Sequence, residues 1–198
     1  MNKTGVIYGI NGPVVYLKGN TGFKMSEMVY VGKERLVGEV IALTKDTTTV
    51  QVFEETTGLK PGETVTASGD ALSVTLGPGI LNNIFDGIER PLSEIAKQSG
   101  KYISRGLTVD SLDTEKKWQT HITVKPGEFV SGGTIIAEVQ ETQAIVHKSM
   151  VPPNISGTVL EVAMDGEYTI NEPIVTVQLA NGKEEKLTLA QKWPIRVP

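Results

Sequence analysis

The stretch Leu72-Ser-Val-Thr-Leu-Gly-Pro-Gly-Ile-Leu-Asn-Asn-Ile-Phe-Asp-Gly-Ile-Glu-Arg-Pro-Leu92 divides the chain into two β-rich parts. It begins with a short apolar strand and breaks at Gly77-Pro78-Gly79. An apolar segment follows, then an Asp86-Gly87 turn and a helix that starts at Pro91. Proline is favoured in the first turn of a helix because its fixed φ suits the helix and its missing N–H needs no partner there. We therefore expect a short helical joint between two larger parts.

Residues 80–99 are the helical region that the sequence predicts. Apolar residues recur there at the spacing of one helix face. They are Leu81, Ile84, Phe85 and Ile88 before the Asp-Gly turn, and Leu92, Ile95 and Ala96 after Pro91. Gly100 is the expected stop, because glycine readily adopts the left-handed conformation that ends helices. We expect these apolar residues to pack in a core and not to form a ligand site.

The part before the joint reads as a small β-barrel. Short β-branched runs alternate with turn residues, and a series of such short strands is typical of a closed barrel, which leaves no sheet edge exposed. The expected strands cover residues 6–8, 14–16, 28–31, 36–41 and 48–53. A Lys-Pro-Gly-Glu turn follows at residues 60–63 and returns at 125–128. Its Pro-Gly pair predicts a type II turn, in which glycine supplies the positive φ.

The part after the joint reads as a second β-rich module. Its expected strands cover residues 120–124, 134–139, 144–146, 157–162, 168–170, 174–179 and 185–189. Asp165-Gly166 and Asn181-Gly182 predict tight hairpins. The chain is thus expected to be mainly β, with a barrel over 1–70, a strand and short helices over 71–106, the second module over 107–188 and a linker over 189–198.

Composition excludes several classes of function. The 198 residues carry a net charge of −4, and their mean hydropathy is −0.08. No basic stripe suggests nucleic-acid binding, since Lys116-Lys117 is too short to form one. No apolar run approaches the roughly 18 residues that insertion into a membrane requires. There is no cysteine, which excludes disulfides and thiolate metal sites.

The sequence predicts no catalytic, cofactor-binding or metal-binding residue. A phosphate-binding loop needs a glycine five positions before its Gly-Lys pair. The pairs that begin at Gly32, Gly100 and Gly182 all lack it. His121 and His147 have no second histidine at ligand spacing. The acidic pairs Glu54-Glu55 and Glu184-Glu185 are expected to be solvated loop charges, and Gly77-Pro78-Gly79 a structural turn.

One resemblance lies in the second module. Its pattern is similar to the biotinyl and lipoyl carrier domains, which fold as barrel-sandwich hybrids. The matching residues are Pro126-Gly-Glu-Phe-Val130, Gly133, Glu138, Glu141-Thr142, Val151-Pro152-Pro153, Gly157-Thr-Val159 and Gly166-Glu167. Such carriers need a lysine at the tip of an exposed hairpin. Gln143 and Ala144 stand there in this sequence, and Lys148 is the nearest amine. A covalent carrier protein is therefore the alternative function.

A second resemblance covers almost the whole chain. The opening stretch and many other motifs are similar to the catalytic A subunit of V-type and A-type rotary ATPases. They include Gly9-x-x-Gly-Pro-Val-Val15, Gly38-Glu-Val-Ile41, Gln51-Val-Phe-Glu-Glu-Thr-Thr-Gly-Leu59, Glu115-Lys-Lys-Trp118, Val139-Gln-Glu-Thr142, Asp165-Gly-Glu-Tyr-Thr169 and Leu189-Ala-Gln-Lys-Trp-Pro194. Residues 107–188 would then be the insertion that distinguishes A subunits from their B-subunit partners.

The second resemblance implies a role in assembly. In that family the barrels of A and B subunits form a crown, and the insertion contacts the peripheral stalk. The resemblance implies that the intact protein binds ATP and Mg²⁺, couples ATP hydrolysis or synthesis to movement of H⁺ or Na⁺, and is cytoplasmic and peripheral to the membrane. Because no phosphate-binding loop precedes Pro198, we expect this chain alone to be inactive, with its nucleotide domain missing. A stand-alone binding protein of 198 residues is a further alternative.

Overall fold

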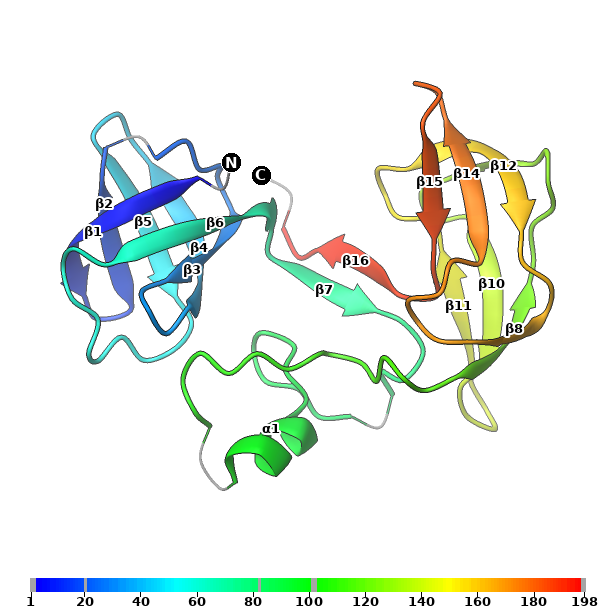
Figure 1. Ribbon diagram of the computed structural model, residues 1–198, viewed down its shortest axis with the longest axis horizontal. Helices are drawn as coiled ribbons and strands as arrows, with labels where there is room; N and C mark the ends of the chain where they lie inside the picture. The colour runs from blue at the N-terminus through cyan, green and yellow to red at the C-terminus, as the bar shows by residue number, and fades with distance from the viewer. Residues whose placement is uncertain (1–2, 20, 82, 101–102, 197–198) are drawn as a thin grey trace. The chain divides into compact units, whose positions relative to one another are not determined.

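The computed structural model describes residues 3–19, 21–81, 83–100 and 103–196. The chain divides into two compact units. The first comprises residues 1–74, 86–109 and 194–198, and the second comprises residues 75–85 and 110–193. Figure 1 shows the elements of each unit as ribbons. The described part of the chain has no helix whose length and hydropathy would let it cross a lipid bilayer.

The first unit is built on a closed antiparallel barrel with the strand order β1-β2-β5-β4-β3-β6 (Figure 1). Its strands are β1 (Thr4–Asn11), β2 (Val14–Lys18), β3 (Glu27–Val31), β4 (Leu36–Leu43), β5 (Thr47–Val52) and β6 (Thr64–Ala71). Alternate side chains point inward, as a strand's period of two requires. Val15, Leu17, Val29 and Val50 are completely buried inside it. The expected barrel is confirmed.

The two Lys-Pro-Gly-Glu turns have the same geometry. Gly62 has φ 93° and Gly127 has φ 89°, which are the positive values that a type II turn requires. In each turn the backbone N–H of the glutamate donates to the lysine carbonyl at 3.2 Å. The glutamate side chain in turn accepts the lysine N–H at 3.1 Å. The predicted turn type at residues 60–63 and 125–128 is confirmed.

The second unit contains two four-stranded antiparallel sheets, with orders β11-β10-β8-β13 and β15-β14-β12-β9. Its strands are β8 (Trp118–Ile122), β9 (Phe129–Ser131), β10 (Ile135–Gln140), β11 (Val146–Met150), β12 (Ser156–Val162), β13 (Gly166–Tyr168), β14 (Val175–Leu179) and β15 (Glu184–Leu187). Trp118, Ile136 and Val139 from one sheet share a core with Val159 and Val177 from the other. This is the sandwich that the sequence predicts.

Several strands complete or shift the predicted pattern. β6 and β9 were not expected as strands, β11 begins where the expected strand over 144–146 ends, and β13 ends where the expected strand over 168–170 begins. β16 (Gln191–Pro194) falls within the expected linker and pairs with β7 (Ser73–Leu76) in a two-stranded sheet.

One of the two predicted hairpins is wrong. Asn181-Gly182 does join β14 to β15, with Gly182 at φ 79°. Asp165-Gly166 does not form a hairpin, because β12 and β13 belong to different sheets. The Asp165 carboxylate instead accepts the backbone N–H of Ile122 on β8 at 2.9 Å. Asp165 therefore holds the segment that passes from β12 in one sheet to β13 in the other.

The helix predicted before Pro91 is absent from the described residues of 80–88. At the end of this range the side chain of Asp86 forms a different set of bonds: its Oδ1 accepts the backbone N–H groups of Ile88 at 3.0 Å and Arg90 at 2.9 Å. The backbone N–H of Asp86 also donates to the Arg90 carbonyl. Aspartate side chains compete with helical hydrogen bonds in this way, and here they close a compact loop.

The helix predicted after Pro91 is confirmed as α1 (Leu92–Ser99). Pro91 occupies the position just before it, and Gly100 ends it with φ 73° while donating its N–H to the Ala96 carbonyl. Ile95 is the residue of α1 that is buried. The helix is therefore short and turns a single residue into the core.

Arg90 connects the loop before α1 to other parts of the first unit. Its Nε donates to Asp86 Oδ2 at 2.7 Å, and its Nη1 donates to the Leu107 carbonyl at 3.1 Å. The same nitrogen lies 3.6 Å from Glu54 Oε2. Burial raises the pKa of the Asp86 carboxyl. The hydrogen bonds from Arg90 and Ile88 lower this pKa, and together they outweigh burial, so the pKa lies below its usual value.

Glu54 corrects a second prediction. Its side chain is only 7% exposed, so it is not a solvated loop charge. It accepts the backbone N–H of Gly106 at 2.9 Å in addition to its ion pair with Arg90. Its neighbour Glu55 and the pair Glu184-Glu185 are exposed, as expected.

We expect Arg90→Ala to destabilise the first unit by about 3 kcal/mol, because it leaves two poorly solvated carboxylates without their cation. Urea unfolding followed by far-ultraviolet circular dichroism measures the change. Lys97→Ala is the matched control. Lys97 pairs with Glu94 on the surface of α1, and such a pair contributes about 0.5 kcal/mol or less. Equal losses in the two variants would contradict the structural role of Arg90.

Candidate functional site

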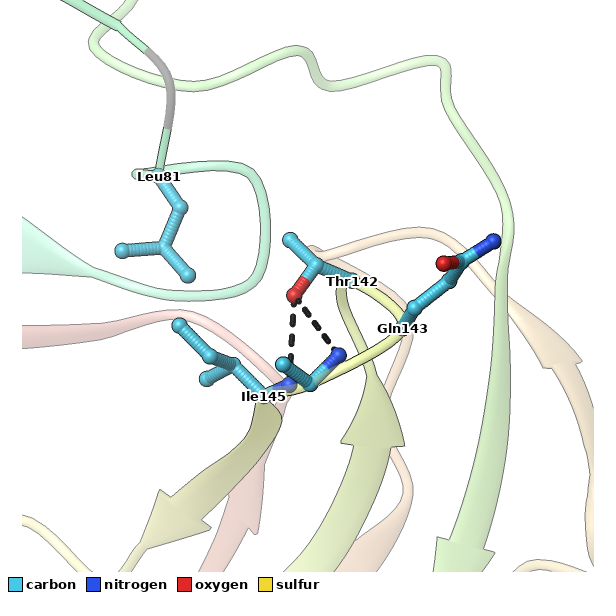
Figure 2. A pocket seen from close by; sticks show the side chains of 5 residues that line it. Leu81, Thr142, Gln143 and Ile145 are labelled. Carbon is cyan, nitrogen blue, oxygen red and sulfur yellow. Dashed lines mark hydrogen bonds between the residues drawn. The ribbon is translucent and has the colours of Figure 1, made fainter.

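The hairpin between β10 and β11 carries the clearest candidate site in the described residues. Its tip, residues 141–145, borders an open depression of about 490 Å³ lined by Leu81, Thr142, Gln143, Ala144 and Ile145. Figure 2 shows Leu81 and Ile145 extending into the space between the two segments. Thr142 Oγ1 accepts the backbone N–H groups of Ala144 at 3.3 Å and Ile145 at 3.1 Å. The tip is therefore an ordered turn.

The position of Lys148 does not suit a covalent carrier. A carrier lysine must project from the hairpin tip, and the described tip contains none. Lys148 lies within β11, directly opposite Glu138 of β10, and its Nζ is 3.7 Å from the Glu138 carboxylate. The tip itself presents Gln143 and Ala144, which offer no amine. The geometry therefore gives no support to the carrier alternative.

Glu141 fixes the Gly-Pro-Gly break from within the second unit. Its side chain is 3% exposed. Its Oε1 accepts the backbone N–H groups of Gly79 at 2.8 Å and Leu81 at 3.1 Å. A Cβ on Gly77 would lie 2.9 Å from Leu112, and Gly79 has φ 104°. Close packing and a positive φ therefore explain both glycines, as expected of a structural turn.

His147 lies beside the second oxygen of the same carboxylate. Its Nδ1 is 3.7 Å from Glu141 Oε2, and that oxygen has no hydrogen-bond partner among the described residues. Burial lowers the pKa of His147, and the Glu141 charge opposes this effect only in part. No sequence motif indicated this pair, because His147 and Glu141 belong to different sides of the hairpin.

His121 has the opposite environment. It is exposed, and its Nδ1 lies 2.6 Å from Asp165 Oδ2. The hydrogen bond and charge of Asp165 raise the pKa of His121 above its usual value. Each histidine is thus paired with one carboxylate. No group of three or more potential metal ligands occurs within the described ranges.

Comparison with known proteins identifies both units. Residues 7–69 match the model of the ATP synthase alpha/beta family β-barrel domain. Residues 109–196 match the model of the ATP synthase alpha/beta subunit barrel-sandwich domain. The two matches follow one another along the chain, and they define it as a member of the ATP synthase alpha/beta class of proteins.

Individual relatives narrow the class. The chain is 50% identical over 198 residues to the V-type ATP synthase alpha chain of Halothermothrix orenii, covering all of this chain and 34% of the relative. It is 50% identical over 194 residues to the A subunit of the A-type ATP synthase of Methanopyrus kandleri, covering 98% of this chain and 33% of that relative. For the A subunit of the A-type ATP synthase of Pyrococcus abyssi the identity is 48%, covering 100% of this chain and 19% of that relative.

The chain therefore belongs to the family of V-type and A-type ATP synthase A subunits, as the sequence motifs indicated. It spans about a third of the length of the first two of these relatives. What it contains is the β-barrel domain and the barrel-sandwich domain.

The Asp165 contact makes a testable prediction about His121. We expect the His121 pKa to lie above 6.5 and to fall toward that value in Asp165→Asn. Because the folded-state pKa is raised, this contact stabilises the fold below pH 6.5, and its contribution is lost as the pH rises through the folded-state pKa. Titration of the imidazole resonances by NMR measures both values. An unchanged pKa in Asp165→Asn would contradict the assignment.

His147 should behave in the opposite way. We expect its pKa to lie below 6.5 and to fall further in Glu141→Gln, because the attracting charge is removed while burial remains. A lowered folded-state pKa means that the stabilising contribution is present above pH 6.5 and is lost as the pH falls from 6.5 through the folded-state pKa. The same NMR titration tests this, with Glu138→Gln as the control. A rise in the His147 pKa on removing the Glu141 charge would refute the pairing.

Proposed function

We propose that this chain is the N-terminal part of the catalytic A subunit of a V/A-type ATPase, and that it serves assembly and not catalysis. The observation that carries the proposal is the alignment of the whole chain, at 50% identity, with about a third of an A-type or V-type relative. The 198 residues contain no phosphate-binding loop. ATP and Mg²⁺ would be bound elsewhere in the intact protein, which couples ATP hydrolysis or synthesis to movement of H⁺ or Na⁺.

The barrel is proposed to join the barrels of B subunits in a crown. A closed barrel has no free strand edge, so it must contact its neighbours through outward side chains. β1 offers two large exposed ones, Val6 at 53% and Tyr8 at 52%. Tyr8 lies beside Tyr16 of β2, with ring centroids 6.2 Å apart. Aromatic residues are enriched at protein interfaces, and this supports a partner for the β1–β2 face.

The barrel-sandwich domain is proposed to contact the peripheral stalk. Its most exposed large apolar residues are Phe129 at 72% on β9 and Met164 at 84% after β12. Exposed apolar side chains of this size suit a protein partner better than bulk water. The assembled complex would lie on the cytoplasmic side of the membrane, with this chain peripheral to the bilayer and without nucleic acid.

The barrel contact can be tested with isolated B subunits of a V-type ATPase. We expect the chain to bind them, and the double variant Val6→Lys, Tyr8→Lys to bind at least tenfold more weakly, because two charges would be buried without partners. Met164→Lys places the same charge on an exposed apolar site of the other domain and should leave B-subunit binding unchanged. Native mass spectrometry detects the complex of the chain with B subunits, and calorimetry measures the affinity of the chain and of each variant for them.

Calorimetry with ATP and Mg²⁺ tests whether the chain holds a nucleotide site, which catalysis would require. We expect no heat beyond dilution, because the sequence contains no glycine-rich loop with the Gly-Lys pair that would hold the phosphates. Micromolar ATP binding by the 198-residue chain would mean that these residues hold a nucleotide site. It would overturn the assembly-only proposal while leaving family membership intact.

A further inference from the structure

The Glu141 carboxylate joins two segments that lie 60 or more residues apart in the chain. One is the hairpin tip, residues 141–145, and the other is the loop over residues 77–81. The backbone N–H groups of Gly79 and Leu81 both donate to the same oxygen, Oε1. Neither residue belongs to a strand or helix, so this carboxylate takes the place of a regular backbone ladder. Hydrogen bonds to a charged acceptor are stronger than neutral ones.

The position of Glu141 depends on the fold of the tip. The backbone N–H groups of Glu141 and Thr142 donate to the Ile145 carbonyl at 3.1 Å and 3.2 Å. Thr142 Oγ1 closes the turn by accepting from Ala144 and Ile145. Gln140 Nε2 adds a bond to the Thr142 carbonyl at 2.6 Å. A change in this turn therefore moves the backbone that carries the Glu141 side chain.

The tip is accessible, whereas the bond that it controls is buried. Gln143, Ala144 and Ile145 are exposed, and with Leu81 they border the open depression in Figure 2. The Glu141 side chain, by contrast, is almost completely buried, and its Oε2 has no hydrogen-bond partner among the described residues. An incompletely satisfied buried carboxylate costs free energy, and this cost brings the closed and open arrangements closer in energy.

We propose that the β10–β11 hairpin tip is a conformational latch that holds the 77–81 loop through Glu141, so that displacing the exposed tip releases the backbone of Gly79 and Leu81. The latch lies entirely within the second unit. It does not depend on the proposed assembly function. A molecule that displaces the tip at the depression would, through Glu141, also release the loop over residues 77–81 that follows β7.

Hydrogen exchange of individual amides, followed by NMR on the full chain, tests the latch. Glu141→Ala removes the acceptor, and we expect exchange at Gly79 and Leu81 to rise by about tenfold or more, as loss of a charge-assisted hydrogen bond implies. Thr142→Ala touches neither amide but opens the turn. We expect it to accelerate exchange at the same two amides by about fivefold, and Thr142→Ser, which keeps the hydroxyl, to restore the wild-type rate.

Thr134→Ala is the matched control. The Thr134 hydroxyl accepts the Ser131 N–H in the turn between β9 and β10, so the variant loses the same chemistry elsewhere in the unit. It should leave exchange at Gly79 and Leu81 within about twofold of the wild type. The amides of the buried residues Val159 and Ile174, which donate to the Glu128 and Leu187 carbonyls in the same unit, report whether a variant unfolds that unit as a whole.

The outcomes separate a latch from a static contact. Acceleration at Gly79 and Leu81 in Thr142→Ala, with Thr134→Ala unchanged, supports the latch. If Glu141→Ala accelerates these amides and Thr142→Ala does not, Glu141 is only a local cap and the proposal fails. It also fails if Thr134→Ala has the same effect as Thr142→Ala. Should Glu141→Ala not fold, Glu141→Gln, which keeps an oxygen acceptor without the charge, takes its place and should cause a smaller acceleration.

Discussion

Carboxylates that accept backbone N–H groups hold the loops of this protein. The described chain has a single short helix, so its long connections cannot satisfy their N–H groups within helices. Acidic side chains supply the acceptors, both in exposed turns such as those at Lys60 and Lys125 and in the part-buried loops at Gly79 and Gly106, and an ionised acceptor strengthens each of these hydrogen bonds. The acidic acceptors are Glu27, Glu54, Glu63, Asp86, Asp113, Glu128, Glu141, Asp165 and Glu172.

Not all of the acidic residues behind the chain's net charge of −4 contribute to a solvated surface. Several carboxylates are structural and lie out of the solvent. Glu39 on the barrel is 2% exposed and accepts Arg196 at 3.2 Å, while Glu54 and Asp86 share Arg90. The arginines follow the barrel in sequence and come from segments on either side of the barrel-sandwich domain. Packing of these segments on the barrel therefore depends on charge neutralisation as well as on apolar contact.

The sequence-based predictions were correct where the structure depends on residues close together in the chain, and they failed where it depends on contacts that no local pattern shows. Five of the six barrel strands, all but β6, and the Lys-Pro-Gly-Glu turns were predicted because alternation and turn chemistry act over a few residues. The helix over 80–88 is replaced by a loop, in which the Asp86 side chain accepts the backbone N–H of Ile88, which the last helical turn would have used, and that of Arg90. The Asp165-Gly166 hairpin failed because its flanking strands enter different sheets. No local pattern reports such a crossing.

The sequence by itself determined the mainly β architecture and the family, since each rests on local periodicity or on motifs in order. Only the tertiary structure decided what Glu54, Glu141 and His147 do. The partners of Glu54, and the backbone N–H groups that donate to Glu141, lie more than thirty residues away in the chain, and burial follows from packing and not from residue type. An exposed glutamate and a structural one read alike in a sequence, because only the fold determines which of them loses its water.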